Sequence, residues 1–397
     1  MELYVQMGHA MQGLALDLLG ENGPKTQILS PINMTESSME SHSKKVLKGD
    51  GALLIDPQLY YPRKYHKNLV KYKYFPKDGA TLFENGVCSD IIYELSRLND
   101  IMSTCGFILP AYTEKRVDDR WNRVQQEIAR SARKCTKKLL YQTIALSSDL
   151  IMDTDQVQQI VGFAESWESE GVYIVCEHPD KYYLVEKPLW VSNLMELVAS
   201  LKRQGKKVIV GYASHQLLCL SLAKCDAIAS GNFLNLRWFK PDRFETNDEA
   251  NVSQRSTWYY CPQALSEFKI PFLDIAKRMN ILDRMRPSPD TMTSYCEILF
   301  GAALPTATAY SEKEAFRHYL LALHKQCQAA VRSTYSETLS AHLLLLQTAE
   351  GLLKGLRDKG IRGQDRDFGD IIDVNRAAVA AFDMAYGAAM KNEWPTL

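Results

Sequence analysis

The chain has no long apolar run and no excess of either charge. None of its 397 residues belongs to a run approaching the roughly 18 apolar residues that a membrane span requires, so we expect no membrane insertion. Lys plus Arg and Asp plus Glu both number 47, so the whole chain has no net field that would concentrate a polyanion. Binding of nucleic acid would therefore need a local basic patch.

Cysteine shows no pairing pattern. The nine cysteines are an odd number and lie mostly inside apolar runs, where cysteine behaves as a small buried hydrophobe. The segment 1–23 has no basic start and carries Glu2 and Asp17, which is unlike a secretory signal. These features predict a cytoplasmic protein with reduced thiols.

Signatures of metal and nucleotide sites are also missing. The sequence has no His-x-His after the first predicted strand, no His-x-x-x-His and no Cys-x-x-Cys, which are common metal-binding spacings. It lacks the P-loop and the Rossmann glycine fingerprint as well. We therefore predict no metal site and no cofactor.

The first two thirds of the chain alternate short β-rich apolar runs with longer amphipathic segments, as expected for a parallel sheet covered by helices. The predicted strands are Gln27–Pro31, Ala52–Pro57, Gly106–Pro110, Leu139–Leu146, Val172–Glu177, Lys207–Tyr212, Asp226–Gly231 and Thr257–Pro262. The predicted helices between them are Ser37–Leu47, Cys88–Ser103, Glu114–Lys134, Thr154–Ser169, Val191–Gln204 and Gln216–Lys224. Eight such strands favour a (β/α)8, or TIM, barrel over an open doubly wound sheet.

After Pro262 the pattern becomes helical. We predict a barrel over residues 1–262 and a C-terminal helical region over 263–397, packed on the barrel or forming an interface. Phe239–Ser256 is polar and is predicted to be a loop after the seventh strand. The predicted C-terminal helices are Gln263–Met279, Met292–Leu299, Glu312–Val331, Ser336–Arg357 and Ile371–Lys391.

Two acidic residues at strand ends are candidate catalytic groups, since barrel active sites lie where strands end. Asp56 closes an apolar run and is followed by a proline; a carboxylate there is costly unless it caps a loop, pairs with a base or binds a ligand. Glu177 and His178 end another strand with side chains on opposite faces, so only one of them can face the barrel mouth. We predict Asp56 and Glu177 as acid/base or nucleophile, with loop capping and a structural ion pair as the alternatives.

Other polar residues at strand ends are candidate ligand contacts. The segment Ala229–Phe239 is the most distinctive, because Ser-Gly-Asn after a strand allows a turn whose N–H groups face a ligand. Arg237 in this segment would add a bidentate contact to phosphate or carboxylate; a tight turn with an arginine salt bridge is the alternative. The full predicted ligand-binding set is Ser30, Gln58, Gln142, Tyr212, His215, Gly231, Asn232 and Arg237.

The run Val208–Phe239 resembles the tRNA-guanine transglycosylase barrel in its strand ending in Gly, its helix, its Cys-Asp entry to the next strand and its Arg-containing loop. The helix Ala315–Gln326 is similar to the C-terminal helix of that family, and together these segments cover about a tenth of the chain. The family's Asp-Ser-Gly-Gly-Phe-Gln segment and Cys-x-Cys-x-x-Cys zinc ligands have no counterpart, and Ala229–Ser230 stands where its nucleophilic Asp is expected. The resemblance implies a barrel fold and nucleobase-type ligands, and transfers no catalytic residue.

Two hypotheses follow. The first is a transferase or hydrolase that binds a polar, phosphorylated or nucleobase-containing small molecule, or nucleic acid, at the strand ends. The second is a non-catalytic barrel subunit or binding module that meets a second copy or another protein through Ser336–Arg357 and Ile371–Lys391. An enzyme should bring its polar groups together in an open pocket, whereas a scaffold can have that mouth filled by apolar side chains.

Overall fold

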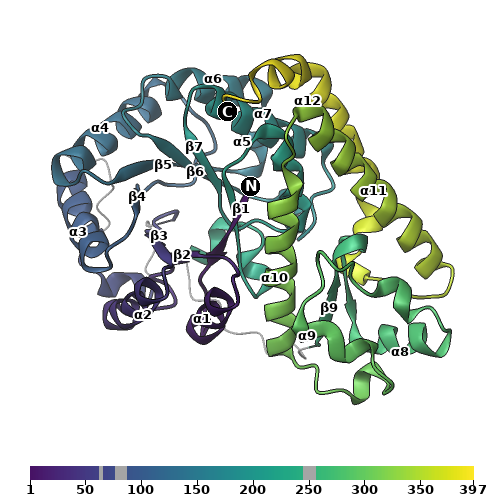
Figure 1. Ribbon diagram of the computed structural model, residues 1–397. Coiled ribbons are helices and arrows are strands. Elements are labelled where there is room, and N and C mark those ends of the chain that lie inside the picture. The colour runs from purple at the N-terminus through teal and green to yellow at the C-terminus, as the bar shows by residue number, and fades with distance from the viewer. Residues whose placement is uncertain (62–65, 77–86, 245–255) are drawn as a thin grey trace.

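The computed structural model describes residues 1–61, 66–76, 87–244 and 256–397. Eight parallel strands form one sheet in the order β3-β2-β1-β8-β7-β6-β5-β4 (Figure 1). The N–H of Cys105, just before β4, donates to Leu53 O of β3 at 3.0 Å, so the two ends of the sheet meet in a nearly closed TIM barrel. The strands are β1 (Glu2–Gln6), β2 (Thr26–Leu29), β3 (Ala52–Ile55), β4 (Gly106–Ile108), β5 (Leu139–Leu146), β6 (Gly171–Cys176), β7 (Lys207–Val210) and β8 (Ala227–Ser230).

Seven of the predicted strands are confirmed, and the predicted fold class is confirmed with them. The first barrel strand, β1, is absent from the prediction. Its side chains alternate between the barrel interior and the outer layer: Gln6 contacts Tyr173 inside the barrel, while Leu3 and Val5 are buried apolar residues. A strand with polar groups on its inward face has no continuous apolar run to recognise.

The prediction that Thr257–Pro262 is the eighth barrel strand is wrong. This segment contains β9 (Trp258–Cys261), which pairs antiparallel with β10 (Ser266–Lys269) in a separate two-stranded sheet. The connection is the short turn η6 (Pro262–Ala264) followed by Leu265 at a φ of 49°. So short a link can join antiparallel strands only, since a parallel crossover needs about a dozen residues. The predicted boundary between the barrel and the C-terminal region, after residue 262, stays a prediction. It falls between the two strands of this hairpin.

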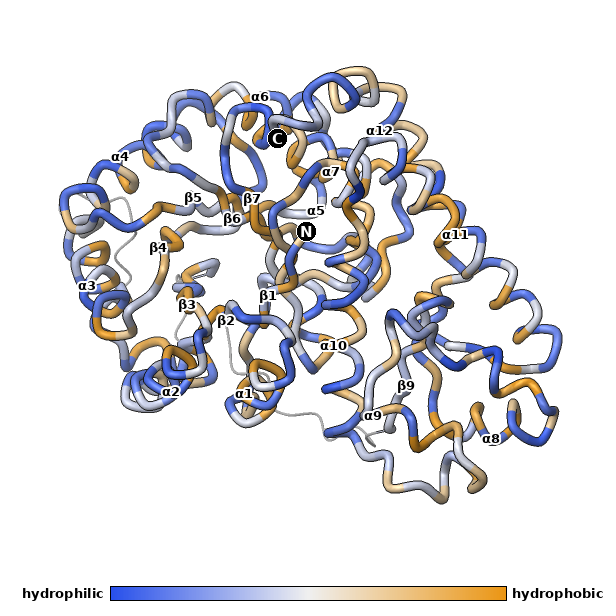
Figure 2. Tube along the Cα trace, viewed as in Figure 1, coloured by the Kyte–Doolittle hydropathy of each residue, from blue (hydrophilic) through white to orange (hydrophobic). Residues whose placement is uncertain are grey.

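Helices surround the barrel; in Figure 2, β4, β6 and β7 carry hydrophobic residues, whereas α4 is largely hydrophilic. Side-chain caps start several of them; Thr35, for example, accepts from Ser38 N–H before α2. The predicted helix at 216–224 is instead the 3-10 segment η3 (His215–Ala223). The helices up to β8 are α1 (Gln12–Gly20), α2 (Glu36–Lys48), α3 (Val87–Ile101), α4 (Asp119–Cys135), α5 (Ser148–Met152), α6 (Thr154–Ala164) and α7 (Pro188–Arg203).

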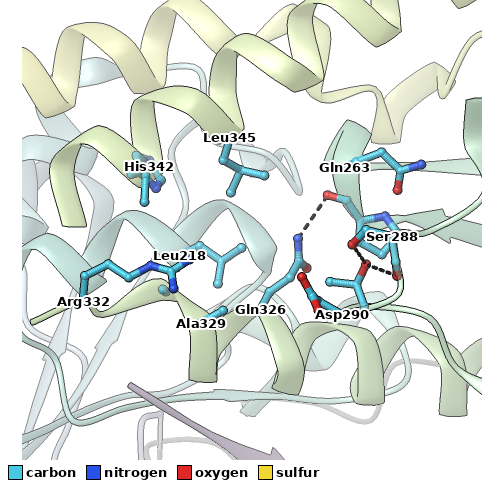
Figure 3. Close-up of a pocket in the computed structure, with 13 residues that line it drawn as sticks. Leu218, Gln263, Ser288, Asp290, Gln326, Ala329, Arg332, His342 and Leu345 are labelled. Atoms are coloured by element: carbon cyan, nitrogen blue, oxygen red, sulfur yellow. Dashed lines mark hydrogen bonds between the residues drawn. The ribbon is translucent and has the colours of Figure 1, made fainter. Parts of the chain in front are cut away.

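The C-terminal part contains α8 (Ile270–Arg278), α9 (Ser294–Glu297), α10 (Glu312–Ala330), α11 (Tyr335–Arg357) and α12 (Ile372–Glu393). The three long helices confirm the predicted ones, whereas the predicted helix Gln263–Met279 divides into β10 and α8. Helix α12 packs on α7, where Ser200 and Tyr386 hydroxyls lie 2.8 Å apart. Helices α10 and α11 flank a pocket that Figure 3 shows in close-up. In the described part of the chain, no helix is both long and apolar enough to cross a membrane.

Tyrosine rings fill the barrel interior. A Cβ on Gly106 or Gly171 would come within 2.7 Å of the Tyr141 ring, and a Cβ on Gly211 would come 2.3 Å from Tyr173 Oη. Glycine at these positions therefore makes room for the rings. The interior is packed up to the carboxyl ends of the strands, where the candidate site lies.

Candidate active site

Asp56 lies at the carboxyl end of β3 and is completely buried. Its Oδ1 accepts hydrogen bonds from Tyr60 Oη at 2.8 Å and from Gln58 N–H at 3.0 Å. Its Oδ2 accepts from Tyr212 Oη at 2.8 Å and lies 3.4 Å from Tyr173 Oη. Among the described residues, no Lys, Arg or His bonds to this carboxylate, which is thus held by neutral donors alone.

Burial raises the pKa of Asp56 to about 6, although the hydrogen bonds from Tyr212, Tyr60, Gln58 and Tyr173 act in the opposite direction. Burial also raises the pKa of each of the three tyrosines well above its ordinary value, so their hydroxyls stay protonated and act as donors. Such a carboxyl group exchanges its proton near neutral pH, which is the property required of a general acid or base.

Two of the residues around Asp56 have left-handed backbone conformations. Gln58 has a φ of 57° and Tyr212 a φ of 53°, and residues other than glycine rarely adopt such backbone angles. Gln58 is fixed by its side chain, which bonds to Ser30 Oγ at 2.9 Å and to Tyr212 Oη at 3.1 Å. Strained backbone held by a hydrogen-bonded network is common at functional sites.

The structure therefore brings together four of the residues predicted from sequence: Ser30, Asp56, Gln58 and Tyr212. Three further members of the cluster were not predicted, namely Gln6, Tyr60 and Tyr173. Tyr173 Oη lies 3.1 Å from Gln6 Oε1, and Gln6 Nε2 is buried with no partner among the described residues. Of these three, Tyr173 could have been found from sequence, because the alternation of side chains along β6 places it inside the barrel.

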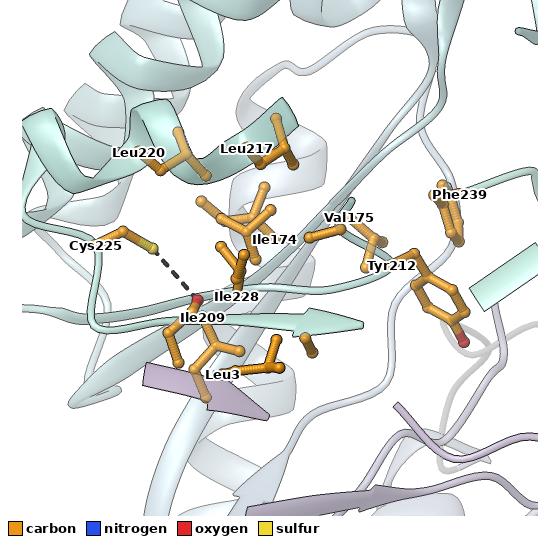
Figure 4. Close-up of a cluster of buried hydrophobic side chains, with 14 of the residues drawn as sticks. Leu3, Ile174, Val175, Ile209, Tyr212, Leu217, Leu220, Cys225, Ile228 and Phe239 are labelled. Carbon is orange, nitrogen blue, oxygen red and sulfur yellow. Dashed lines mark hydrogen bonds between the residues drawn. The ribbon is translucent and has the colours of Figure 1, made fainter. Parts of the chain in front are cut away.

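Four aromatic rings cover Asp56. Phe239 lies 4.9 Å from Tyr60 and 5.5 Å from Tyr212, and Phe244 lies 4.8 Å and 6.0 Å from the same two rings, measured between centroids. Each of these rings is buried. Figure 4 shows Tyr212 and Phe239 at one end of an apolar cluster that continues toward Leu217 and Leu220 of η3. Apolar rings therefore fill the barrel mouth above its polar base, which is the arrangement expected of a scaffold and not the open pocket expected of an enzyme.

The other predicted catalytic residue, Glu177, lies elsewhere at the strand ends. It is half-buried, and its Oε2 accepts from Ser148 N–H at 3.2 Å, at the start of α5. No hydrogen bond within the described residues joins Glu177 to Asp56. Gln142 points away from the mouth as well, because its side chain bonds to Gln125 of α4. Neither residue belongs to the Asp56 cluster.

His215 and Arg237 belong to a second buried cluster, around Glu267 of β10. Arg237 Nη1 pairs with Glu267 Oε1 at 3.0 Å, and Arg366 Nη1 pairs with its Oε2 at 2.8 Å. Burial alone would raise the pKa of Glu267, but the charges of Arg366 and Arg237 outweigh it and lower the pKa to about 2. Burial lowers the pKa of His215 to about 4, so this imidazole is neutral near pH 7.

Arg237 also binds the turn that follows β8. Its Nε donates to Gly231 O at 2.8 Å, its Nη2 donates to Asn232 O at 2.7 Å, and its guanidinium stacks on the Tyr319 ring at 3.3 Å. All three nitrogens of the guanidinium thus have protein acceptors. This is the geometry of the alternative, in which a tight turn is held by an arginine salt bridge, and it connects the barrel to β10 and α10. A ligand role for Arg237 and its neighbours stays a prediction.

Within residues 1–61, 66–76, 87–244 and 256–397, no three His, Cys, Asp or Glu side chains are placed to share a metal ion. The chemistry that the Asp56 cluster can perform with its own groups is proton transfer.

No protein-family model matches the chain, and no curated protein sequence matches it. Among solved structures, 3-dehydroquinate dehydratase from Aquifex aeolicus shares 8% identity, with 62% of this chain and 95% of that one covered and a TM-score of 0.35. An L-ribulose 3-epimerase shares 11%, with 64% and 89% covered and a TM-score of 0.37. A dihydrodipicolinate synthase from Bacillus anthracis shares 9%, with 83% and 98% covered and a TM-score of 0.34. At these values the likenesses say nothing about the chemistry of this chain, whose TIM-barrel assignment rests on its own strand order.

Proposed function

We propose that the protein is a barrel enzyme that uses Asp56 as its acid/base group. The observation that carries the proposal is a fully buried carboxylate at the carboxyl end of the barrel, bound by neutral donors and with a pKa of about 6. Ionised Asp56 accepts a proton from the substrate, and the hydroxyls of Tyr60 and Tyr212 orient the carboxylate for this step.

The surroundings favour an uncharged, hydrogen-bonding substrate with a flat ring. Among the described residues, no basic side chain bonds to the Asp56 carboxylate, so none there would neutralise a phosphate. The rings of Phe239 and Phe244 offer apolar faces. Gln6 Nε2 supplies a donor that has no described protein partner. A nucleobase has these properties, in agreement with the resemblance of the segment Val208–Phe239 to the transglycosylase barrel. Entry requires Phe239 and Phe244 to separate from the tyrosine rings.

The test measures binding and turnover of a panel of nucleobases and nucleosides, using calorimetry and chromatography of the products. Asp56→Asn should lower turnover by about 10²-fold or more, because general acid–base catalysis contributes roughly that much. The matched control is Asp274→Asn, which neutralises an aspartate that bonds to Thr306 in the C-terminal part. Turnover that survives in the Asp56 variant, or that falls equally in both variants, would overturn the assignment.

A second candidate, a non-catalytic subunit that self-associates, is favoured by a different observation. Leu344 of α11 is 62% exposed and Met384 of α12 is 87% exposed, so each of these helices leaves a large apolar side chain uncovered. Sedimentation of the wild type and of a Leu344→Glu, Met384→Glu variant distinguishes the candidates. An oligomer that dissociates in this variant, together with no turnover, supports the subunit; a monomer in both proteins excludes self-association through these two side chains.

A further inference from the structure

A pocket of about 220 Å³ lies between α10, α11 and η3, outside the Asp56 cluster. Leu218 of η3 and Leu345 of α11 face each other across it, and Gln326 of α10 lies to one side of both (Figure 3). The apolar residues that line it are Leu218, Pro262, Ala329, Ala330, Ala341 and Leu345. An apolar cavity of roughly 150 Å³ admits benzene, so this pocket has room for a six-membered ring with a substituent.

One end of the pocket carries two polar groups that lack partners. His342 is 7% exposed, and its Nε2 is buried without a hydrogen bond in the described part of the chain. Arg332 is exposed, so water can solvate its guanidinium, which has no ion pair or hydrogen bond among the described residues; Figure 3 shows it on the same side as His342. The buried, unpaired Nε2 of His342 costs free energy that a ligand acceptor would recover. Burial keeps His342 neutral near pH 7, because it lowers the pKa to about 4.

The opposite end of the pocket carries an acidic and a hydroxyl side chain in place of basic ones. Asp290 and Ser288 lie there, away from Arg332 and His342 (Figure 3). Gln326 is already bound, since it donates to Pro262 O at 3.0 Å and accepts from Tyr260 Oη at 2.8 Å. The electrostatic arrangement therefore orients an anionic ligand with its charge toward Arg332 and its apolar body over Leu218 and Leu345.

We propose that this pocket is a binding site for a small carboxylic acid with an apolar, ring-sized body. The carboxylate accepts hydrogen bonds from Arg332 and from His342 Nε2–H, and the body replaces water against the apolar lining. The site shares none of its lining residues with the Asp56 cluster, so this proposal does not depend on the proposed enzymatic function and is tested separately from it.

The probe is benzoate, titrated calorimetrically into the full chain, with benzamide as the uncharged analogue of the same size. We expect saturable binding of benzoate at about 1 mM or below, and weaker binding of benzamide. Arg332→Gln should weaken benzoate about tenfold and leave benzamide unchanged, because it removes only the charged donor. The matched control is Lys354→Gln, which removes the same charge from α11 outside the pocket.

Ala341→Leu tests the location, since a larger side chain on α11 fills the pocket and should abolish binding of both probes. The fold of each variant is checked by its unfolding temperature. No binding of benzoate to the wild type would overturn the proposal. So would equal binding by the Arg332 and Lys354 variants, or unchanged binding by a folded Ala341→Leu protein.

Discussion

Replacing Asp56 by Asn removes a buried negative charge while keeping the shape of the side chain. The pKa of this carboxyl is about 6 in the folded protein and 3.8 in an unperturbed chain. Because the folded state holds the proton more tightly, it is favoured below pH 3.8 and loses that advantage as the pH rises toward 6. A tenfold difference in proton affinity equals about 1.36 kcal/mol, so the ionised carboxylate costs the folded state about 3 kcal/mol at pH 7.

The free energy of unfolding of Asp56→Asn, minus that of the wild type, should therefore rise by about 2.5 kcal/mol between pH 3.8 and pH 7. Urea unfolding at several pH values in this window measures it, and every other titrating group cancels in the difference. Ser30→Ala is the control, because it removes a hydroxyl bonded to Gln58 without removing a titratable group. A flat difference for Asp56→Asn, or a sloping one for Ser30→Ala, would refute the reasoning.

Two further predictions concern buried contacts. Glu267→Gln leaves the guanidinium groups of Arg237 and Arg366 without their carboxylate and should destabilise the protein by about 3–5 kcal/mol in urea unfolding. Because the folded pKa of Glu267 is lowered to about 2, the wild type should lose this contribution as the pH falls from 4.5 toward 2. Gly211→Ala places a methyl group 2.3 Å from Tyr173 Oη and should cost about 1–3 kcal/mol, measured in the same way.

Each of these predictions has an outcome that would contradict it. An unchanged stability of Glu267→Gln would mean that Arg237 and Arg366 find other acceptors. For the glycine prediction, Gly162→Ala in α6 is the control, since its added Cβ would meet nothing within 4 Å and helix propensity should make it stabilising. If Gly211→Ala were as well tolerated as Gly162→Ala, the tyrosine packing inside the barrel would be looser than described.

The barrel could be predicted from sequence because parallel strands covered on both faces are apolar throughout and leave a repeated pattern. That pattern fails at the two ends of the barrel sequence. Strand β1 carries Tyr4 and Gln6 among apolar residues, so it is not a continuous apolar run. Strand β9 is as apolar as a barrel strand, but its partner β10 follows within a few residues, and the sequence of the turn did not reveal the hairpin.

Part of the site could be predicted as well. Asp56 and Ser30 directly follow strands, Gln58 and Tyr212 come within three residues of a strand end, and a closed barrel must bring the carboxyl ends of its strands together. Gln142, in contrast, lies within β5, where a shift of one residue decides whether a side chain faces the interior or the helices. Its bond to Gln125 of α4 shows that the Gln142 side chain faces the helices, and only the three-dimensional register determines this orientation.

The tyrosines around Asp56 show why sequence reasoning could locate the acid but not its environment. Tyr60 is four residues away along the chain, whereas Tyr173 and Tyr212 are 117 and 156 residues away. The pKa of Asp56 depends on all three hydroxyls and on burial beneath Phe239, none of which a local motif encodes. The position of a carboxylate at a strand end is a property of the sequence pattern, but its readiness to exchange a proton near pH 6 is a property of closure of the barrel. Gly211→Ala, whose methyl group would displace the Tyr173 hydroxyl that bonds to Asp56, should therefore change the titration of Asp56 even though residues 56 and 211 are far apart in sequence.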